Sequence, residues 1–166
     1  PLAAQPDRHP DDDDQADKYE FVDEQLTAAG LANYEVSNWA VPGHESRHNF
    51  LYWRQQNYRG FGCAAHSHAD GRRWWNIRTP DRYIDAVNAG VSVEASSETL
   101  DVNQRRSEGQ QLTLRTRDGV ERSAFDEATL ELVGDMVVEH PTEPERVVLT
   151  RSGRLMANDI SVRLRD

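Results

Sequence analysis

The chain has 166 residues and a single cysteine, Cys63. Because one cysteine cannot form an internal disulfide, we expect the reducing cytoplasm as the compartment. No apolar run approaches the roughly 20 residues of a membrane-spanning helix, and no stretch near the N-terminus is typical of a secretory signal. We therefore expect a cytoplasmic protein with no transmembrane segment. Its first residue is Pro1 and not methionine, and we expect the chain to be an excerpt of a longer protein.

Large apolar side chains are scarce as well. Leu, Ile, Val and Phe together make up 33 of the 166 residues, and the formal net charge is -10. This composition lies near the limit at which a charged chain can bury enough apolar surface to fold. Four tryptophans and five tyrosines argue against disorder, because aromatic side chains bury large areas. We expect one domain or two small ones, which form part of a larger fold or borrow apolar surface from a partner.

The charge is distributed unevenly along the chain. The first 30 residues carry nine carboxylates, whereas residues 44–83 carry seven arginines against three acids. The same window holds four of the six histidines and eight of the thirteen aromatic residues. Five arginines near the C-terminus raise nucleic-acid binding as a rival function: Arg146, Arg151, Arg154, Arg163 and Arg165. Since the whole chain is acidic, with a pI of about 5.0, we expect no nucleic-acid partner.

Residues 1–13 are expected to form a polar linker, and residues 14–95 a first structural unit. Within that unit the patterns predict a helix from Asp14 or Asp17 to Ala29, a strand over 34–39, an irregular or partly helical stretch over 44–57, a buried strand over 59–65, a hairpin over 66–76 and a helix from Thr79-Pro80 to Gly90. The predicted hairpin turns at Asp70-Gly71, a two-residue sequence favoured in such turns.

Residues 96–166 are expected to form a second, winged-helix-like unit. The patterns predict a weak helix over 101–114, a helix capped by Asp126 with an apolar stripe of Leu130, Val133 and Val137, a strand over 146–149, and a final helix capped by Thr150 that carries Met156, Ile160 and Leu164 on one face. In the second of these helices Phe125 can pack onto Leu130.

Three small patterns suggest chemistry without defining it. His66 and His68 share one face of a predicted strand, but a metal site needs further ligands. Cys63 beside His66 would suit a thiol nucleophile, although a cysteine in such a sequence is more often a small buried residue. Gly60-x-Gly62 is an incomplete phosphate loop, and we expect these glycines to permit a close approach of a cofactor or a neighbouring strand.

The richest pattern runs from Pro42 to Arg54. A porphyrin is a flat apolar disc with carboxylates and, when it holds iron, needs an axial ligand. His48 suits the iron, Tyr52 and Trp53 suit the ring, and Arg47 or Arg54 suits a propionate. From these residues alone, a structural loop with packed aromatics is an equally good interpretation.

The segments YEVSNWA (34–40) and PGHESRHNFLYW (42–53) resemble the HemW family of haem chaperones, which is related to oxygen-independent coproporphyrinogen III dehydrogenase among the radical S-adenosylmethionine (SAM) proteins. GFGCAAHS (60–67), RTRDGV (115–120) and LTRSGRLMA (149–157) are similar to further motifs of that family. The resemblance covers about residues 15–165.

The resemblance implies an α/β fold, with the closing part of a partial (β/α) barrel over 14–95 and a winged-helix-like domain over 96–166. It implies haem binding by His48, with His48 as the iron ligand, and by Asn49, Tyr52, Trp53 and Arg47. It implies contacts to SAM from Gly60, Gly62, Ala65 and His66. A 4Fe-4S cluster belongs to the full-length family, but its three cysteine ligands are absent here, so we expect this chain alone to be inactive towards SAM.

The resemblance implies a function as well. We expect the C-terminal part of a haem chaperone that binds haem or a porphyrin and passes haem to recipient haemoproteins. The alternative is an oxygen-independent coproporphyrinogen III oxidase, and the third is an independent regulatory binding module.

Overall fold

The computed structural model describes residues 11–165, so most of the predicted linker over 1–13 lies outside the described residues. In chain order the elements are α1 (Asp12–Ala28), β1 (Ala32–Glu35), β2 (Asn38–Ala40), α2 (Arg47–Trp53), β3 (His66–Ala69), β4 (Arg72–Asn76), α3 (Pro80–Asn88), β5 (Glu94–Thr99), α4 (Val102–Leu114), β6 (Val120–Glu121), α5 (Glu127–Val133), β7 (Val137–Glu139), β8 (Arg146–Leu149), α6 (Arg151–Leu155) and α7 (Ala157–Ser161), with short 3₁₀ turns η3 (Arg122–Ala124) and η4 (Gly134–Met136).

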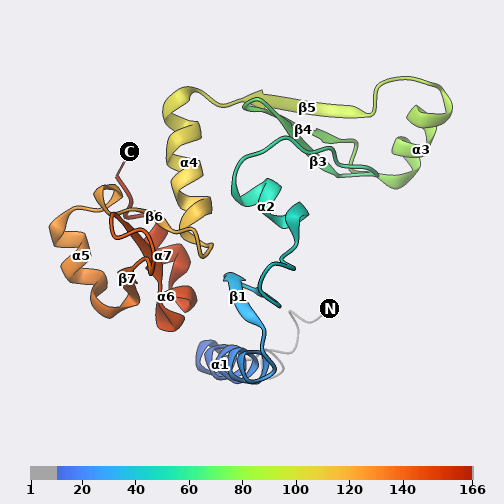
Figure 1. Ribbon diagram of the computed structural model, residues 1–166. Coiled ribbons are helices and arrows are strands. Elements are labelled where there is room, and N and C mark those ends of the chain that lie inside the picture. The colour runs from blue at the N-terminus through green and yellow to red at the C-terminus, as the bar shows by residue number, and fades with distance from the viewer. Residues whose placement is uncertain (1–10, 166) are drawn as a thin grey trace.

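The strands form three small sheets. β1 pairs with β2, β3–β4–β5 form a second sheet, and β6–β8–β7 form a third. Every strand pair among the described residues is antiparallel, so residues 11–165 close no parallel barrel of the kind expected for 14–95. Figure 1 shows the β3–β4–β5 sheet and α3 at one end, α1 at the opposite end, and α4 leading from that sheet to the C-terminal elements. β5 runs across residue 95, where the sequence analysis placed the junction between units.

α1 begins two residues before the earlier of its two predicted starts. Asp11 caps it by accepting a hydrogen bond from the Asp14 backbone N–H at 2.8 Å. The carboxylates that follow lie in the first turn, where the partial positive charge of the helix end stabilises them. The acidic run is therefore part of the helix and not of a linker.

A buried carboxylate joins α1 to the C-terminal part of the chain. Asp23 is 4% exposed and accepts a hydrogen bond from Trp39 Nε1 at 2.7 Å. It also pairs with Arg151 Nε at 2.6 Å and with Arg154 Nη2 at 3.1 Å. Tyr19, one turn earlier on α1, accepts from Arg154 Nε and donates to the Val36 carbonyl.

The strand predicted over 34–39 is wrong in one respect, because it is a hairpin. β1 and β2 turn at Val36-Ser37, where Ser37 N–H donates to the buried Glu35 carboxylate and Asn38 binds the same group. Local hydrogen bonds to this carboxylate thus satisfy a turn that lacks the usual glycine or proline.

The strand predicted over 59–65 is also wrong, because this segment is a loop. It leads into β3, and the β3–β4 hairpin is confirmed with its turn at Asp70-Gly71, both in the left-handed region (φ 52° and 88°). The helix predicted from Pro80 is confirmed as α3.

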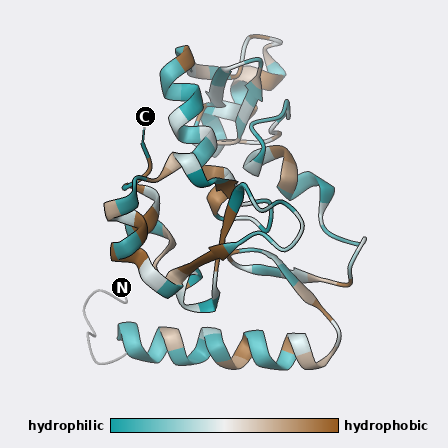
Figure 2. Cartoon of the chain, turned by 60° about the vertical axis from the view of Figure 1, so that its left-hand side comes forward, coloured by the Kyte–Doolittle hydropathy of each residue, from teal (hydrophilic) through white to brown (hydrophobic). Residues whose placement is uncertain are grey.

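The principal hydrophobic core lies in the C-terminal part. It comprises Leu114, Val120, Ala124, Phe125, Val133, Val147, Leu149, Ala157 and Ile160. Figure 2 shows that α1, by contrast, is largely hydrophilic along its length. The caps at Asp126 and Thr150 are confirmed, as is the strand over 146–149.

Two details of the C-terminal prediction are wrong. The helix after Asp126 ends at Val133, so Val137 belongs to β7 and does not continue its stripe. The final helix is interrupted at Met156, which separates α6 from α7. Among the described residues, no helix combines the length and apolarity needed to cross a membrane.

Candidate functional site

α2 is the element that carries the predicted haem-binding residues. Ser46 caps it by accepting a hydrogen bond from the Asn49 backbone N–H at 3.3 Å, which explains the helical start after the Pro42-Gly43 turn. Phe50 faces inward, where it is 7% exposed and its ring lies 5.4 Å from that of Tyr34. Asn49 also faces Tyr34, donating to its hydroxyl at 3.1 Å.

The residues on both sides of α2 form ion pairs with the turn that contains Arg117 and Asp118. Before the helix, Glu45 pairs with Arg117 Nη1 at 2.5 Å. Hydrogen bonds from the backbone N–H groups of Glu45 and Gly43 lower the pKa of the Glu45 carboxyl, and Arg117 adds a smaller contribution. After the helix, Arg54 donates to Asp118 at 2.8 and 2.6 Å, and its guanidinium lies 4.2 Å from the Phe50 ring centre. Because Arg54 already forms this ion pair with Asp118, it is not available to bind a propionate.

The outer face of α2 carries His48 and Tyr52. His48 Nε2 lies 2.7 Å from the Tyr52 hydroxyl, and the two rings meet edge to face with centres 5.0 Å apart. The expectation that these residues share one helix face is confirmed. Arg47 is exposed and has no ion pair with any of residues 11–165, whereas Trp53 is half-buried.

A row of rings continues inward from this face. Tyr52 packs on Tyr58 with ring centres 4.4 Å apart, and Tyr58 stacks on His68 at 6.1 Å. Burial raises the pKa of Tyr58, with a smaller contribution from Tyr52. We call His48, Tyr52, Tyr58 and His68 the ring row. Tyr58 was not among the residues predicted for the site, because its only local signal was aromatic character.

His68 is a structural residue. Its Nδ1 lies 3.0 Å from the Gln56 carbonyl and its Nε2 accepts from the Gly71 N–H at 3.2 Å, so both ring nitrogens have a hydrogen-bond partner. Among residues 11–165 no group of three His, Cys, Asp or Glu side chains is placed to hold a metal ion. The metal site considered for His66 and His68 is therefore not formed.

In the glycine-rich loop over 59–65, the backbone N–H groups of the glycines are hydrogen-bonded within the protein. A Cβ at Gly60 would lie 2.1 Å from the His66 carbonyl oxygen, so the close approach predicted there is made by β3 itself. The Gly60 N–H donates to Ser67 and the Gly62 N–H to the Tyr83 hydroxyl. These donors are not free to cradle a phosphate, and no helix follows them directly.

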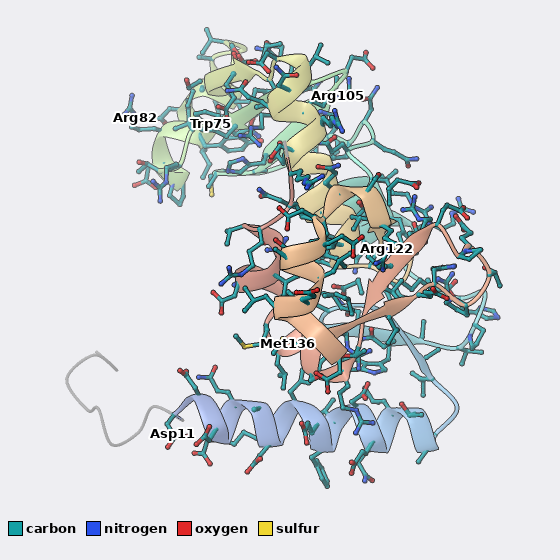
Figure 3. The ribbon with its side chains drawn as sticks, turned by 90° about the vertical axis from the view of Figure 1, so that its left-hand side faces the viewer. Asp11, Trp75, Arg82, Arg105, Arg122 and Met136 are labelled. Atoms are coloured by element: carbon teal, nitrogen blue, oxygen red, sulfur yellow. The ribbon has the colours of Figure 1, made fainter. Side chains whose placement is uncertain are left out.

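The other predicted SAM contacts are more accessible. His66 is exposed and stacks on Trp75 with centres 5.8 Å apart, and Ala65 is half-buried. Figure 3 places Trp75 and Arg82 at the end of the molecule far from Asp11. Cys63 is exposed, so its interpretation as a buried apolar residue is wrong. One thiol cannot supply the three thiolates of a 4Fe-4S cluster, so this chain's residues do not fit that group.

The candidate site is an open helix face. A hollow of about 860 Å³ lies elsewhere, between α1 and the last two helices, and is lined by Tyr19, Met136 and Met156 among others. None of the predicted haem or cofactor contacts lines it.

Comparison with known proteins first concerns the fold. No family model matches the chain. Its fold is similar to that of the radical SAM enzyme coproporphyrinogen III oxidase (HemN) from Escherichia coli, with a TM-score of 0.61 at 15% identity over 86% of this chain and 39% of that chain. At this identity the likeness concerns the fold alone.

The relatives by sequence are haem chaperones. The haem chaperone HemW of Mycobacterium tuberculosis is 37% identical over 155 residues, which cover 91% of this chain and 39% of the relative. The haem chaperone HemW of Bacillus subtilis is 30% identical over 162 residues, covering 91% of this chain and 42% of the relative. Over most of its length the chain is homologous to these HemW proteins, as the sequence resemblance indicated, and it spans about two fifths of the length of these curated relatives.

Proposed function

We propose that this chain supplies the haem-binding surface of a haem chaperone, and that haem docks on the outer face of α2. The observation that carries the proposal is the exposed His48–Tyr52 pair on a helix that is anchored at both flanks. The homologues named haem chaperones support it. Haem is the cargo here, and recipient haemoproteins are the proposed partners.

Each predicted contact has a distinct task in this proposal. His48 binds the iron, while Tyr52 and Trp53 offer aromatic surface to the porphyrin. Arg47 pairs with a propionate, because it has no ion-pair partner among the described residues. Asn49 acts indirectly, since its amide holds the helix against Tyr34. Neutral imidazole is the form that binds iron, so acidic conditions should weaken haem binding.

The wider architecture is proposed along the lines of the sequence analysis. Residues 14–95 contribute to a radical SAM-type barrel and 96–166 form the winged-helix-like domain, which the fold likeness to HemN and the three-stranded β6–β8–β7 sheet support. For SAM we propose contacts from Ala65 and His66, with Gly60 and Gly62 shaping the loop between them. The cytoplasm is the proposed compartment, because an exposed free thiol such as that of Cys63 suits a reducing environment.

The two alternatives have less support. An oxygen-independent coproporphyrinogen III oxidase would match the HemN fold, but at 15% identity, against 37% for a named haem chaperone. Nothing in residues 11–165 favours an independent regulatory module over either.

A haem titration followed by absorbance tests the proposal. The wild-type chain should show saturable binding with a shifted Soret band, which His48→Ala should abolish or weaken at least ten-fold. His44→Ala is the matched control, because His44 is also exposed but precedes the helix. His66→Ala tests the main competing histidine. If His48→Ala binds haem like the wild type, α2 is not the site.

A further inference from the structure

We propose that Tyr52 is an internal competitor of the haem iron for His48, and that this competition sets how readily haem is released. The inference rests on the proposed function, since it concerns how the same helix face gives up its cargo. It assigns the Tyr52 hydroxyl a task different from that of the Tyr52 ring, which faces the porphyrin.

The first step is the hydrogen bond itself. His48 Nε2 is the ring nitrogen farther from the backbone, and it lies 2.7 Å from the Tyr52 hydroxyl. An imidazole nitrogen has one lone pair or one proton, so it either accepts from the phenol or donates to it. In both cases the hydrogen bond must break before Nε2 can bind iron. Where Nε2 is the donor, its proton must also leave to solvent while Nδ1 takes one up, so that the neutral ring presents a lone pair at Nε2. The phenol proton stays on Tyr52, and no electron is transferred.

The second step is that the Tyr52 ring is held in position. Tyr58 packs against it with ring centres 4.4 Å apart. Tyr58 in turn stacks on His68 and exchanges two backbone hydrogen bonds with it, at 2.9 and 3.0 Å. His68 is fixed through both of its ring nitrogens. The ring row therefore keeps the hydroxyl next to His48, although His48 itself is exposed.

The third step concerns magnitude. A single hydrogen bond of this kind contributes a modest net amount, which corresponds to roughly a two- to ten-fold change in an equilibrium constant. Such a factor weakens haem binding without preventing it. A protein that delivers haem needs binding of this kind, because a ligand held too firmly does not dissociate in time to be transferred.

Tyr52→Phe in the full chain tests the proposal, because it removes the hydroxyl and keeps the ring. We expect haem to bind about five-fold more tightly and to dissociate correspondingly more slowly into an excess of apomyoglobin. Tyr19→Phe is the matched control, since it also removes a hydrogen-bonded phenol, but on α1. In a His48→Ala background, Tyr52→Phe should neither restore haem binding nor tighten any residual binding, which separates competition at His48 from a change in structure.

The results that would overturn this inference differ from those that would overturn the proposed function. Unchanged or weaker binding by Tyr52→Phe, with His48→Ala still defective, would overturn the competition and leave the haem site in place. Tightening that persists without His48 would also overturn it. No saturable haem binding by the wild-type chain would overturn the proposed function and this inference together.

Discussion

Arg54 and Asp118 are 64 residues apart in the sequence, yet the guanidinium of Arg54 donates to one Asp118 oxygen through both Nε and Nη2, at 2.8 and 2.6 Å. The preceding residue, Arg117, binds Glu45 on the other flank of α2. Two consecutive residues of the turn between α4 and β6 therefore hold the helix that carries His48. The candidate site depends on the C-terminal half of the chain, although none of its contact residues lies there.

Loss of this attachment should loosen α2 selectively. Asp118→Asn should increase amide hydrogen exchange over residues 47–53 and weaken haem binding about two- to five-fold, since partly exposed ion pairs contribute little individually. The exchanged pair Arg54→Asp with Asp118→Arg should restore part of the protection. Arg122→Ala is the control, because its partner Glu127 lies 3.5 Å away on α5. Equal exchange in α2 and α5 after Asp118→Asn would argue against a local role.

Asp23 should be the most sensitive carboxylate of α1. Asp23→Ala leaves Arg154 and the Trp39 N–H without their buried partner, and we expect a loss of about 3 kcal/mol in the free energy of unfolding. Urea denaturation followed by tryptophan fluorescence measures it, because Trp39 reports on the same cluster. Glu24→Ala serves as the control, since Glu24 reaches Arg151 only from the surface. Similar losses in both variants would contradict the role of burial.

Gly60 should not accept a side chain. Gly60→Ala places a methyl group 2.1 Å from the His66 carbonyl, so the backbone must move, at a cost of roughly 1–3 kcal/mol. Gly62→Ala has open space but a φ of 99°, and should cost about 1 kcal/mol through backbone strain. Thermal unfolding of both variants measures the difference. A larger loss at Gly62 would mean that strain and not the close approach governs this loop.

Alkaline conditions should weaken the fold through Tyr19. Burial raises the pKa of the Tyr19 phenol, although Arg154 partly opposes the shift. Above about pH 10 an unfolded tyrosine loses its proton while the folded one keeps it, so the free energy of unfolding should fall as the pH rises. Tyr19→Phe should reduce this slope between pH 9 and 11 and retain the part that comes from Tyr58, whose pKa is also raised. An unaltered slope would remove Tyr19 from the explanation.

Local signals predicted several elements well. Asp70-Gly71 specified its hairpin, Thr150 its cap, and the run Arg146–Leu149 its strand, because each depends on residues next to each other in the chain. The same is true of His48 and Tyr52, which are one helical turn apart. Thirty-seven per cent identity to a HemW protein also agrees with the resemblance drawn from residues 34–53.

Contacts between distant residues could not be predicted in this way. Nothing in the sequence near Arg54 indicates that Asp118 binds it. The segment over 59–65 has a strand-like composition but forms a loop, and its Gly60 is required by the close approach of the His66 carbonyl. The turn at Val36-Ser37 depends on Glu35, a buried carboxylate, where a turn is usually expected from glycine or proline. Tyr58 was missed because its importance comes from its two ring neighbours.

The attachment of α1 also has a consequence for synthesis on the ribosome. Asp23 meets Arg151 across 128 residues of sequence. At translation rates of about 5–20 residues per second, α1 waits roughly 6–25 s before its arginine partners have been added. Until then its buried carboxylate has no cationic partner from α6, so the nascent helix is exposed to chaperones and proteases for that interval. α1 is therefore synthesised well before α6 and gains its buried ion pairs only after α6 has been added.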